Sequence, residues 1–313
     1  KDKHPLPELI LSYRKLYKLK NTYLDPLPSY IVADTKRVHS SFNQTMTATG
    51  RLSTSSPNFQ NIPIRTEDGK EIRKAIKAQS NEYQIFSADY SQVELRVMAH
   101  LSGDESLISA LNNGEDIHTF TAKNIFNVDN DDMVLPEMRR IAKIVNFGIM
   151  YGAGPFRLSQ ELDIPFGEAK QIKDAYFQKY QGIEQYIENS KLQIKETKSV
   201  ETLLGRKRAV WDSDSQNKIR RDAAERMAIN MPIQGTAAEM IKLAMIKIHR
   251  QMNKENLKSK LIMQIHDELL LEVHQDEIDY ISKMVIEHMR NAMKLDVPIE
   301  IDFGIGPSWY EAH

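Results

Sequence analysis

The stretch YQIFSADYSQVE, residues 83–94, decides the fold. Its first half is an apolar run that ends at Asp89, which predicts a short strand with an acid at its end. Ser91 and Glu94 then have the spacing of a capping box, and the apolar residues after them recur at helical spacing. The stretch therefore predicts a strand that ends in a carboxylate and leads directly into a helix.

A second group of acids lies near the other end of the sequence. Residues 261–273 are apolar on both sides of His266-Asp267-Glu268, which predicts a hairpin with the acids at its turn. Strand ends in one sheet can bring distant residues together, so Asp89 and Asp267 could hold two hard cations about 3.5–4 Å apart and support phosphoryl transfer. The alternative is that Asp89 caps a helix and Asp267 is simply a turn residue.

Strands are predicted toward both ends of the chain and helices between them. This order favours an α+β sheet domain with a helical insertion. A chain that begins inside a helix is also expected to be part of a longer protein. The expected elements are a basic amphipathic helix over 9–19 that ends before Pro26 and Pro28, a strand over 38–47, a loop over 53–63, a mostly helical segment over 104–186 with N-caps at Asp104, Asp116 and Asp131 or Asp132, a hairpin over 202–210, two helices interrupted at Pro232, a helix over 276–294 and a strand over 299–303.

One of the expected helices begins at Pro136 and carries a patterned face. Arg139, Lys143, Phe147 and Tyr151 recur every four residues, so their side chains share that face. Two cations followed by aromatic rings fit a nucleoside triphosphate, with charge for the phosphates and a ring for stacking. The alternative is a solvated basic face whose two aromatic side chains lie in the core.

The densest basic region follows the predicted hairpin turn. It could neutralise the phosphates of a nucleic acid, and a solvated charged face is an equally good interpretation. The region consists of Trp211 with Arg206, Lys207, Arg208, Lys218, Arg220, Arg221 and Arg226.

The composition is that of a globular protein. The chain has 313 residues, with 42 Lys and Arg against 43 Asp and Glu, and 41% of its residues are apolar. The length suggests about two domains, and the apolar content excludes a chain that is disordered as a whole. No apolar run approaches the roughly 18 residues that span a bilayer, which excludes a membrane protein. The sequence has no cysteine, so we expect no disulfide, no thiolate metal site and a reducing, intracellular setting.

Together these segments closely resemble family A DNA polymerases, the family of bacterial DNA polymerase I. The resemblance covers nearly the whole chain and follows the order of motifs in that family. One such motif would be weak evidence, whereas six in order are specific. The motifs are TGRLS at 49–53, PNFQNIP at 57–63, DYSQVELR at 89–96, RRIAK with NFG and YG within 139–152, QGTAA at 234–238 and HDE at 266–268.

The resemblance implies an α+β fold of the right-hand type. Its palm would have an antiparallel sheet, its fingers would be a helical insertion, and most of its thumb would be missing. The implied divisions are a C-terminal remnant of the thumb over 1–36, a first part of the palm over 37–92, fingers over 93–215 and a second part of the palm over 216–313.

The resemblance also implies an activity. The enzyme would carry out template-directed DNA synthesis in replication or repair, adding dNTPs to a primer 3′-OH by two-metal-ion nucleotidyl transfer and releasing pyrophosphate. Its cofactor would be two Mg²⁺ ions, for which Mn²⁺ could substitute. Its partners would be primer–template DNA and dNTPs, with no membrane, and we expect a monomer in the bacterial cytoplasm, associated with the nucleoid.

Catalytic roles are implied for five residues. Asp89 and Asp267 would bind the metal ions together with the Tyr90 carbonyl. Lys143 would protonate the pyrophosphate leaving group. Glu268 would be catalytic, either as a ligand or as a support for the ligands.

Substrate contacts are implied for two further sets. Glu94 would cover the position of a ribose 2′-OH, or it would serve only as the capping-box partner of Ser91, or both. His118 would lie near the triphosphate or would have a structural role. The residues expected to bind the dNTP are Arg139, Lys143, Phe147, His118, Gln92, Glu94 and Tyr151. The residues expected to bind DNA are Arg51, Asn230, Gln234, His266 and Arg226. For Arg226, as for Arg65, the expected role is a phosphate contact or a structural pair.

Other functions compete with DNA synthesis. A palm and fingers without a full thumb could be a remnant that binds DNA or nucleotides without catalysis. Single-subunit RNA polymerases share the right-hand architecture, but Glu94 in place of a small residue favours deoxyribose. Reverse transcriptases are disfavoured, because His266-Asp267-Glu268 stands where a paired Asp-Asp turn would be expected.

Overall fold

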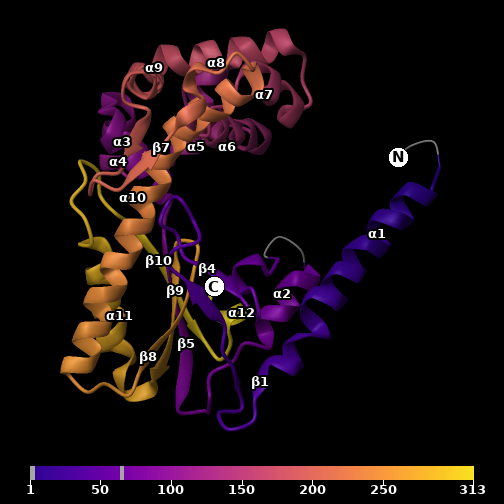
Figure 1. The fold of residues 1–313 in the computed structure, drawn as a ribbon, viewed down its shortest axis with the longest axis vertical. Coiled ribbons are helices and arrows are strands. Elements are labelled where there is room, and N and C mark those ends of the chain that lie inside the picture. Colours follow the sequence, from indigo (N-terminus) through magenta and orange to yellow (C-terminus); the bar gives the residue numbers. More distant parts are fainter. Residues whose placement is uncertain (1–3, 64–66) are drawn as a thin grey trace. The chain divides into compact units, whose positions relative to one another are not determined.

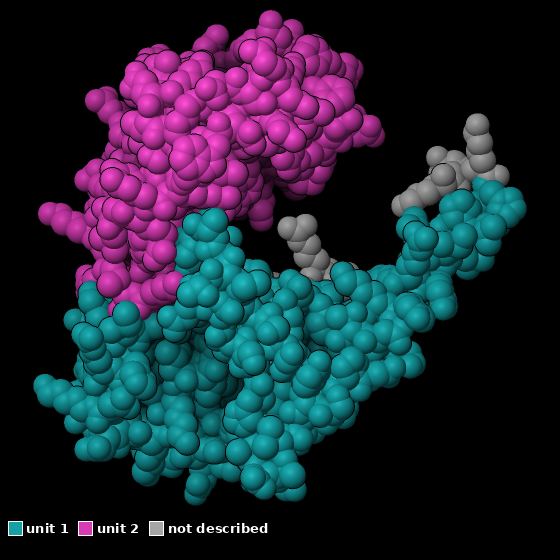
Figure 2. Space-filling model, viewed as in Figure 1, with its two compact units in different colours: residues 1–89, 244–289, 301–313 teal, residues 90–243, 290–300 magenta. Residues whose placement is uncertain are grey.

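The computed structural model describes residues 4–63 and 67–313. Unit 1 contains the largest sheet and unit 2 is mostly helical, so the fold is of the predicted α+β class (Figure 1). Within the described ranges, no helix combines the length and the apolarity needed to cross a membrane. The two units, teal and magenta in Figure 2, are residues 1–89, 244–289 and 301–313 for unit 1 and residues 90–243 and 290–300 for unit 2.

The four-stranded sheet is the centre of unit 1. Its strand order is β10–β5–β9–β8, and β9 runs antiparallel to both β5 and β8. The predicted hairpin over 261–273 is confirmed, since it corresponds to β8 and β9. The bounds are Tyr83–Tyr90 for β5, Lys260–Ile265 for β8, Glu268–His274 for β9 and Ile301–Gly306 for β10.

The register of this sheet fixes where its acids lie. Asp89 on β5 is the direct partner of Glu268 on β9, and Glu268 is also paired with Ile265 on β8. His266 and Asp267 form the turn between β8 and β9, with His266 at a φ of 52°. The acids therefore stand at the end of the β5–β9 pair, as the sequence predicts.

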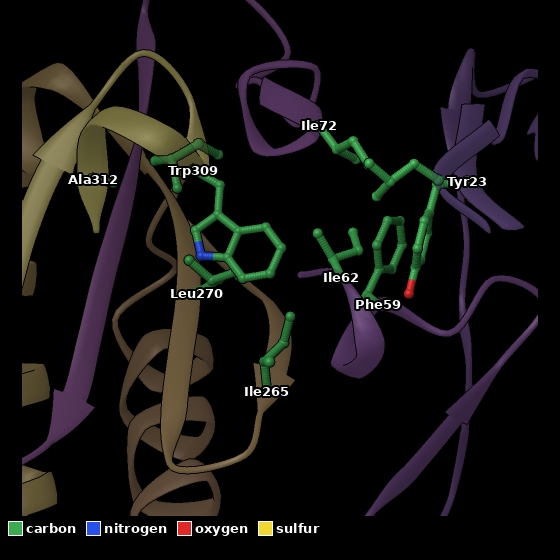
Figure 3. Close-up of a cluster of buried hydrophobic side chains, with 10 residues drawn as sticks. Tyr23, Phe59, Ile62, Ile72, Ile265, Leu270, Trp309 and Ala312 are labelled. Atoms are coloured by element: carbon green, nitrogen blue, oxygen red, sulfur yellow. The ribbon is translucent and has the colours of Figure 1, made fainter. Parts of the chain in front are cut away.

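A hydrophobic cluster packs against this sheet. Trp309, at the start of α12 (Trp309–Ala312), is fully buried, and Figure 3 shows its ring beside Leu270 of β9. The rings of Tyr23 and Phe59 lie together in the same cluster (Figure 3). Each fully buried side chain of this size contributes about 1.5–3 kcal/mol. The cluster therefore ties segments from both ends of the sequence to the sheet.

The N-terminal part of unit 1 consists of short elements. The predicted first helix and its end before Pro26 are confirmed. The single strand expected over 38–47 is instead two short strands, and the loop expected over 53–63 contains a strand and a 3₁₀ turn. The elements are α1 (Leu6–Leu19), a π-helix (Lys20–Leu24), a 3₁₀ turn (Leu27–Tyr30), β1 (Ile31–Val32) with β2 (Arg37–Val38), β3 (Ser41–Asn43) with β4 (Ser53–Ser55), a 3₁₀ turn (Phe59–Asn61) and α2 (Glu67–Lys74).

Unit 2 is built from helices and one small hairpin. A hairpin forms near the stretch expected over 202–210, but its first strand, Ser199–Glu201, lies entirely before that range and only its second strand lies within it. A second cluster, which includes Ile194, Val200 and Ala228, joins α9, β6 and α10. The elements are α3 (Val93–Ser102), α4 (Glu105–Asn112), α5 (Ile117–Phe126), α6 (Pro136–Met150), α7 (Pro155–Leu162), α8 (Phe166–Lys179), α9 (Gln181–Thr197), β6 (Ser199–Glu201), β7 (Lys207–Ala209) and α10 (Lys218–Lys254), which continues into unit 1.

The predicted interruption at Pro232 is wrong. α10 continues through Pro232, although proline removes one helical hydrogen bond. Ala228 and Met231 before the proline and Ile233 after it are all buried, so packing holds both halves in one helix. The helix expected over 276–294 is confirmed as α11 (Ile278–Arg290), which follows a 3₁₀ turn.

The capping predictions have mixed outcomes. Asp104 and Asp116 are the N-caps of α4 and α5, as expected. Asp131 and Asp132 lie in a 3₁₀ turn without a side-chain cap, so the cap predicted there is wrong.

The predicted capping box of Ser91 and Glu94 is wrong as well. Gln92 occupies the N-cap position of α3, in the left-handed region at φ 53°, and no side chain caps this helix. The alternative role of Asp89 as a helix cap also fails, because Asp89 lies inside β5. Glu94 therefore does not cap α3.

Asp104 joins two helices and should be important for stability. Its Oδ1 accepts the Leu107 N–H at 2.9 Å, and its Oδ2 accepts the Gly182 N–H at the start of α9 at 2.8 Å. We predict that Asp104→Ala lowers the free energy of unfolding by about 2–4 kcal/mol, because it removes a cap and leaves a second N–H unpaired. Urea unfolding followed by circular dichroism measures this change.

Asp132→Ala is the matched control, since it replaces an exposed aspartate that caps no helix. Its unfolding midpoint should stay close to that of the parent chain. Equal midpoints for both variants would contradict the role given to Asp104.

Candidate active site

Acidic side chains gather at the end of the β5–β9 pair in unit 1. Burial raises the pKa of Asp89 to about 7, and the charges of Glu268, Asp267 and Asp302 act in the same direction. His313 acts in the opposite direction. The structure thus brings Asp89 and Asp267, 178 positions apart in the sequence, within electrostatic reach of each other.

Glu268 is bound by donors of the protein itself. Its Oε1 accepts hydrogen bonds from Ser87 Oγ at 2.6 Å and from Trp309 Nε1 at 2.8 Å, and His313 Nδ1 lies 3.4 Å away. Burial acts to raise the pKa of Glu268, but the donors His313, Ser87 and Trp309 bring it below its ordinary value. Glu268 is therefore held as a buried carboxylate by groups of the protein itself.

The donor set near Asp89 fits a magnesium ion. Two carboxylates, Asp89 and Asp267, and the main-chain carbonyl of Tyr90 are hard oxygen donors. Mg²⁺ is commonly held by one or two carboxylates and completes its shell with water and substrate phosphates. Among the described residues, no group of three or more His, Asp or Glu side chains is arranged to hold a metal ion. The pKa of Asp89 is raised first by burial and then by the neighbouring carboxylates, and a bound cation would oppose both effects.

In unit 2, α6 presents the predicted cationic face. Arg139 forms a bidentate ion pair with Asp116, at 2.6 Å and 3.1 Å. Burial acts to raise the pKa of Asp116, but the hydrogen bonds from Arg139 and Thr119 lower it to about 2. Lys143 lies one turn further along α6 and is exposed, and no ion pair or hydrogen bond engages its ammonium group among the described residues. Both cations of this face are exposed, and Arg139 is held by its ion pair with Asp116.

His118 lies behind this cationic face and is buried. Burial lowers its pKa to about 4, and the charges of Arg139 and Lys143 act in the same direction, while Asp116 opposes them. The Asn146 amide nitrogen lies 3.1 Å from His118 Nδ1. The imidazole is therefore neutral at pH 7 and can donate from Nε2 without adding charge. Whether His118 has a structural role or lies near a triphosphate stays a prediction.

The aromatic end of α6 contacts the start of α3. The rings of Phe147 and Tyr151 are stacked, with centroids 6.4 Å apart, and the His118 ring lies 5.7 Å from Phe147. The Tyr151 hydroxyl donates a hydrogen bond to Glu94 Oε2 at 2.6 Å. Glu94 is thus fixed by a tertiary contact in place of the predicted capping box. Gln92 precedes it at the N-cap of α3.

The predicted DNA contacts are divided between the units. Arg51 and His266 belong to unit 1, where His266 Nε2 lies 2.9 Å from the Gln60 carbonyl. The other three lie on successive turns of α10 in unit 2 and so share one face. They are Arg226, Asn230 and Gln234. Arg65, the sixth candidate, lies outside the described residues.

The dense basic region is only partly available for phosphate. Arg206 pairs with Glu239 at 3.2 Å, and Arg221 donates to the Ser215 carbonyl at 3.0 Å. Trp211 is 75% exposed, so its ring is not part of the core. Part of this region is therefore engaged in contacts within the protein, and binding of a nucleic acid there stays a prediction.

Sequence reasoning missed the residues that surround Glu268. Ser87 could have been found, because it lies two residues before Asp89 on one strand and so shares its face. Trp309 and His313 carried no local signal. Asp116 was expected only as a cap, and its pairing with Arg139 was not foreseen.

Comparison with known proteins gives a consistent result. A sequence profile of DNA polymerase family A matches residues 1–311. The thermostable DNA polymerase I of Thermus filiformis is 50% identical over 309 residues, which are 99% of this chain and 37% of that protein. DNA polymerase I of Bacillus subtilis is 47% identical over 311 residues, which are 99% of this chain and 35% of that protein. The chain thus spans little more than a third of these relatives.

A solved structure is also similar. The POL domain of Pol1 from M. smegmatis, in complex with a DNA primer–template and a dNTP, superposes with a TM-score of 0.94. It is 44% identical, and the match covers 99% of this chain and 54% of that one. Since the profile and the relatives both match almost all of its residues, this chain belongs to DNA polymerase family A.

Proposed function

We propose that this chain catalyses template-directed DNA synthesis, adding a dNTP to a primer 3′-OH and releasing pyrophosphate. The observation that carries the proposal is the position of Asp89 opposite Glu268 and near Asp267 at one end of the β5–β9 pair. Membership of family A and the likeness to a polymerase domain bound to DNA and dNTP support it.

Asp89 and Asp267, with the Tyr90 carbonyl, would hold two Mg²⁺ ions, or Mn²⁺ in their place. When bound, such ions lower the pKa of the primer 3′-OH and neutralise charge on the triphosphate. Asp89 must give up its proton for this role, because its pKa of about 7 leaves part of it protonated in neutral solution. Glu268 keeps its Oε1 on Ser87 and Trp309 and supports the ligands from behind.

The cationic face of α6 would bind the triphosphate. The bidentate ion pair with Asp116 fixes the position of the Arg139 guanidinium. A phosphate group could replace the Asp116 carboxylate there, and the Arg139 side chain would lose little conformational freedom. Lys143 would bind a neighbouring phosphate oxygen and donate a proton to the pyrophosphate leaving group. Neutral His118 would add a hydrogen bond without competing for the positive charge.

The aromatic end of α6 would receive the sugar and base. Phe147 and Tyr151 offer stacked rings to the nucleotide. Glu94, held by the Tyr151 hydroxyl, would fill the place of a ribose 2′-OH, and Gln92 would lie on the same wall. A fixed side chain excludes an extra hydroxyl better than a mobile one, because a mobile side chain can move aside.

DNA contacts would check pair geometry. Every Watson–Crick pair presents acceptors in the minor groove, at purine N3 and pyrimidine O2. Donors from Arg51, Asn230, Gln234 and His266 could meet these acceptors without reading the sequence. Arg226 would contact phosphate.

The same proposal assigns the palm, fingers and thumb of a right-hand polymerase to parts of this chain. The sheet of unit 1 would be the palm and the helices of unit 2 the fingers, with α1 as the remnant of the thumb. The domain limits at 36, 92 and 215, the action as a monomer and the place in the bacterial cytoplasm at the nucleoid stay predictions.

Removing either proposed ligand tests the function. Asp89→Asn and Asp267→Asn should each lower primer extension at least about a thousandfold, because each removes a charge that holds the metal ions. Binding of primer–template, measured by fluorescence anisotropy at low salt, should change little. Asp302→Asn is the matched control, since Asp302 is an exposed acid that also acts on Asp89.

Asp302→Asn should keep extension within about tenfold of the parent chain. Near-normal turnover in Asp89→Asn or Asp267→Asn would contradict the metal assignment. A parent chain that binds DNA but extends no primer with Mg²⁺ would favour the binding remnant.

The contact between Glu94 and Tyr151 gives a second test. Glu94→Ala should raise incorporation of ribonucleotides relative to deoxyribonucleotides by about tenfold or more, because it opens the space for a 2′-OH. Tyr151→Phe removes only the hydroxyl that fixes Glu94, so it should act in the same direction and more weakly. Single-nucleotide incorporation with matched rNTP and dNTP pairs measures the ratio.

Glu137→Ala serves as control, since Glu137 is an exposed acid on the first turn of α6 that pairs with Arg140. Its sugar selectivity should equal that of the parent chain. An unchanged ratio in Glu94→Ala would leave Glu94 with a structural role only.

A further inference from the structure

Arg73, in the last turn of α2, is a buried cation. Its side chain is only 2% exposed, and none of its three guanidinium nitrogens has a hydrogen-bond partner within the part of the chain that the structure describes. A buried charge without hydrogen bonds is costly, so it persists only where something else stabilises it or needs it. No step of the proposed reaction uses Arg73, so it requires an explanation of its own.

The contact that Arg73 does make is with an aromatic ring. Its guanidinium carbon lies 3.9 Å from the centroid of the Trp309 ring, and Trp309 is itself fully buried. A cation over the face of an indole is attracted to the ring, most strongly when water is excluded. It also draws electron density from the ring, which makes the indole N–H a better donor.

The same indole holds Glu268. Trp309 Nε1 donates to Glu268 Oε1 at 2.8 Å, and Ser87 Oγ donates to the same oxygen at 2.6 Å. Glu268 also acts on Arg73 through its charge, since it favours the protonated guanidinium against the effect of burial on the pKa. Arg73, Trp309 and Glu268 thus form a continuous series from α2 through α12 to β9.

This series ends beside two other carboxylates. Glu268 is the strand partner of Asp89 and the chain neighbour of Asp267. A third carboxylate free to turn toward the metal site would add a ligand and negative charge, which would bind a cation more tightly and alter its geometry. Holding Glu268 on Trp309 prevents this.

We propose that Arg73, acting through the Trp309 indole, is a positioning residue that holds Glu268 away from the metal ions and leaves Asp89 and Asp267 as the ligands. This inference rests on the proposed function, because it assigns a support to the same site. It predicts an unusual combination: loss of Arg73 should tighten divalent-ion binding while it slows turnover. A general destabilisation of the fold would instead weaken divalent-ion binding and also slow turnover.

Arg73→Met tests the proposal, because methionine fills similar space without charge. The Mn²⁺ dissociation constant, measured on the chain alone from the electron paramagnetic resonance of free Mn²⁺, should fall about five- to tenfold. In primer extension, kcat should fall about tenfold with the KM for dNTP unchanged. The melting temperature should stay the same or rise, because an unpaired buried charge is removed.

Two further variants sharpen the test. Trp309→Phe keeps a ring but removes the Nε1 donor, so it should shift Mn²⁺ affinity and kcat in the same directions even if Arg73→Met does not fold. The double variant should equal the stronger single variant, since both interrupt one series. Lys74→Met is the matched control: Lys74 is the next residue of α2 and lies over Tyr310 at 4.6 Å, but it is only partly buried and pairs with Glu71. Its Mn²⁺ affinity and kcat should match those of the parent chain.

The outcomes separate the two proposals. Unchanged or weakened Mn²⁺ binding in Arg73→Met and Trp309→Phe would overturn the role of Arg73, whatever the polymerase activity. Additive effects in the double variant, or a parent chain without measurable Mn²⁺ binding, would overturn it as well. Tighter Mn²⁺ binding in the variants of a chain that extends no primer would support the positioning role and contradict the proposed function.

Discussion

The antiparallel pairing of β5 with β9 is the constraint on which the candidate site depends. Its register sets Asp89 opposite Glu268 and one residue from the Asp267 turn. Because side chains alternate between the faces of a strand, a slip of β5 by one residue would move both Ser87 and Asp89 to the other face, away from Glu268. Leu269 and the two leucines that follow it in β9 are fully buried, so the strand that carries Glu268 is held inside the core.

The two units concentrate charges of opposite sign. Unit 1 gathers carboxylates around Asp89, where burial makes each negative charge costly, and the excess is what a divalent cation would relieve. Unit 2 presents Arg139 and Lys143, which suit phosphate, and Asp116 keeps Arg139 in position in the absence of a nucleotide. His118, neutral through burial, avoids a third positive charge beside them. Unit 1 therefore concentrates negative charge that suits a divalent cation, and unit 2 concentrates positive charge that suits phosphate.

Several elements of the fold and of the candidate site could be predicted from the sequence, because they depend on residues that are close together in the chain. The β8–β9 hairpin, the strand that ends near Asp89 and the cap at Asp104 follow from hydrophobic period and side-chain reach along a few residues. The failures arise where tertiary packing outweighs local preference. Burial on both sides carries α10 through Pro232, and Gln92 in a left-handed conformation removes the capping box, which leaves Glu94 for Tyr151.

The support behind the acids could not be predicted by any local rule. Arg73 stands in the run EDGKEIRK, whose composition indicates a solvated surface helix, yet it is buried against a ring 236 positions later in the chain. Motifs record the groups that touch a substrate, because the chemistry restricts those residue types directly. The groups behind them are restricted only through contacts between distant segments. What a carboxylate such as Glu268 can do depends on which donors already occupy its oxygens, and only the folded chain supplies that information.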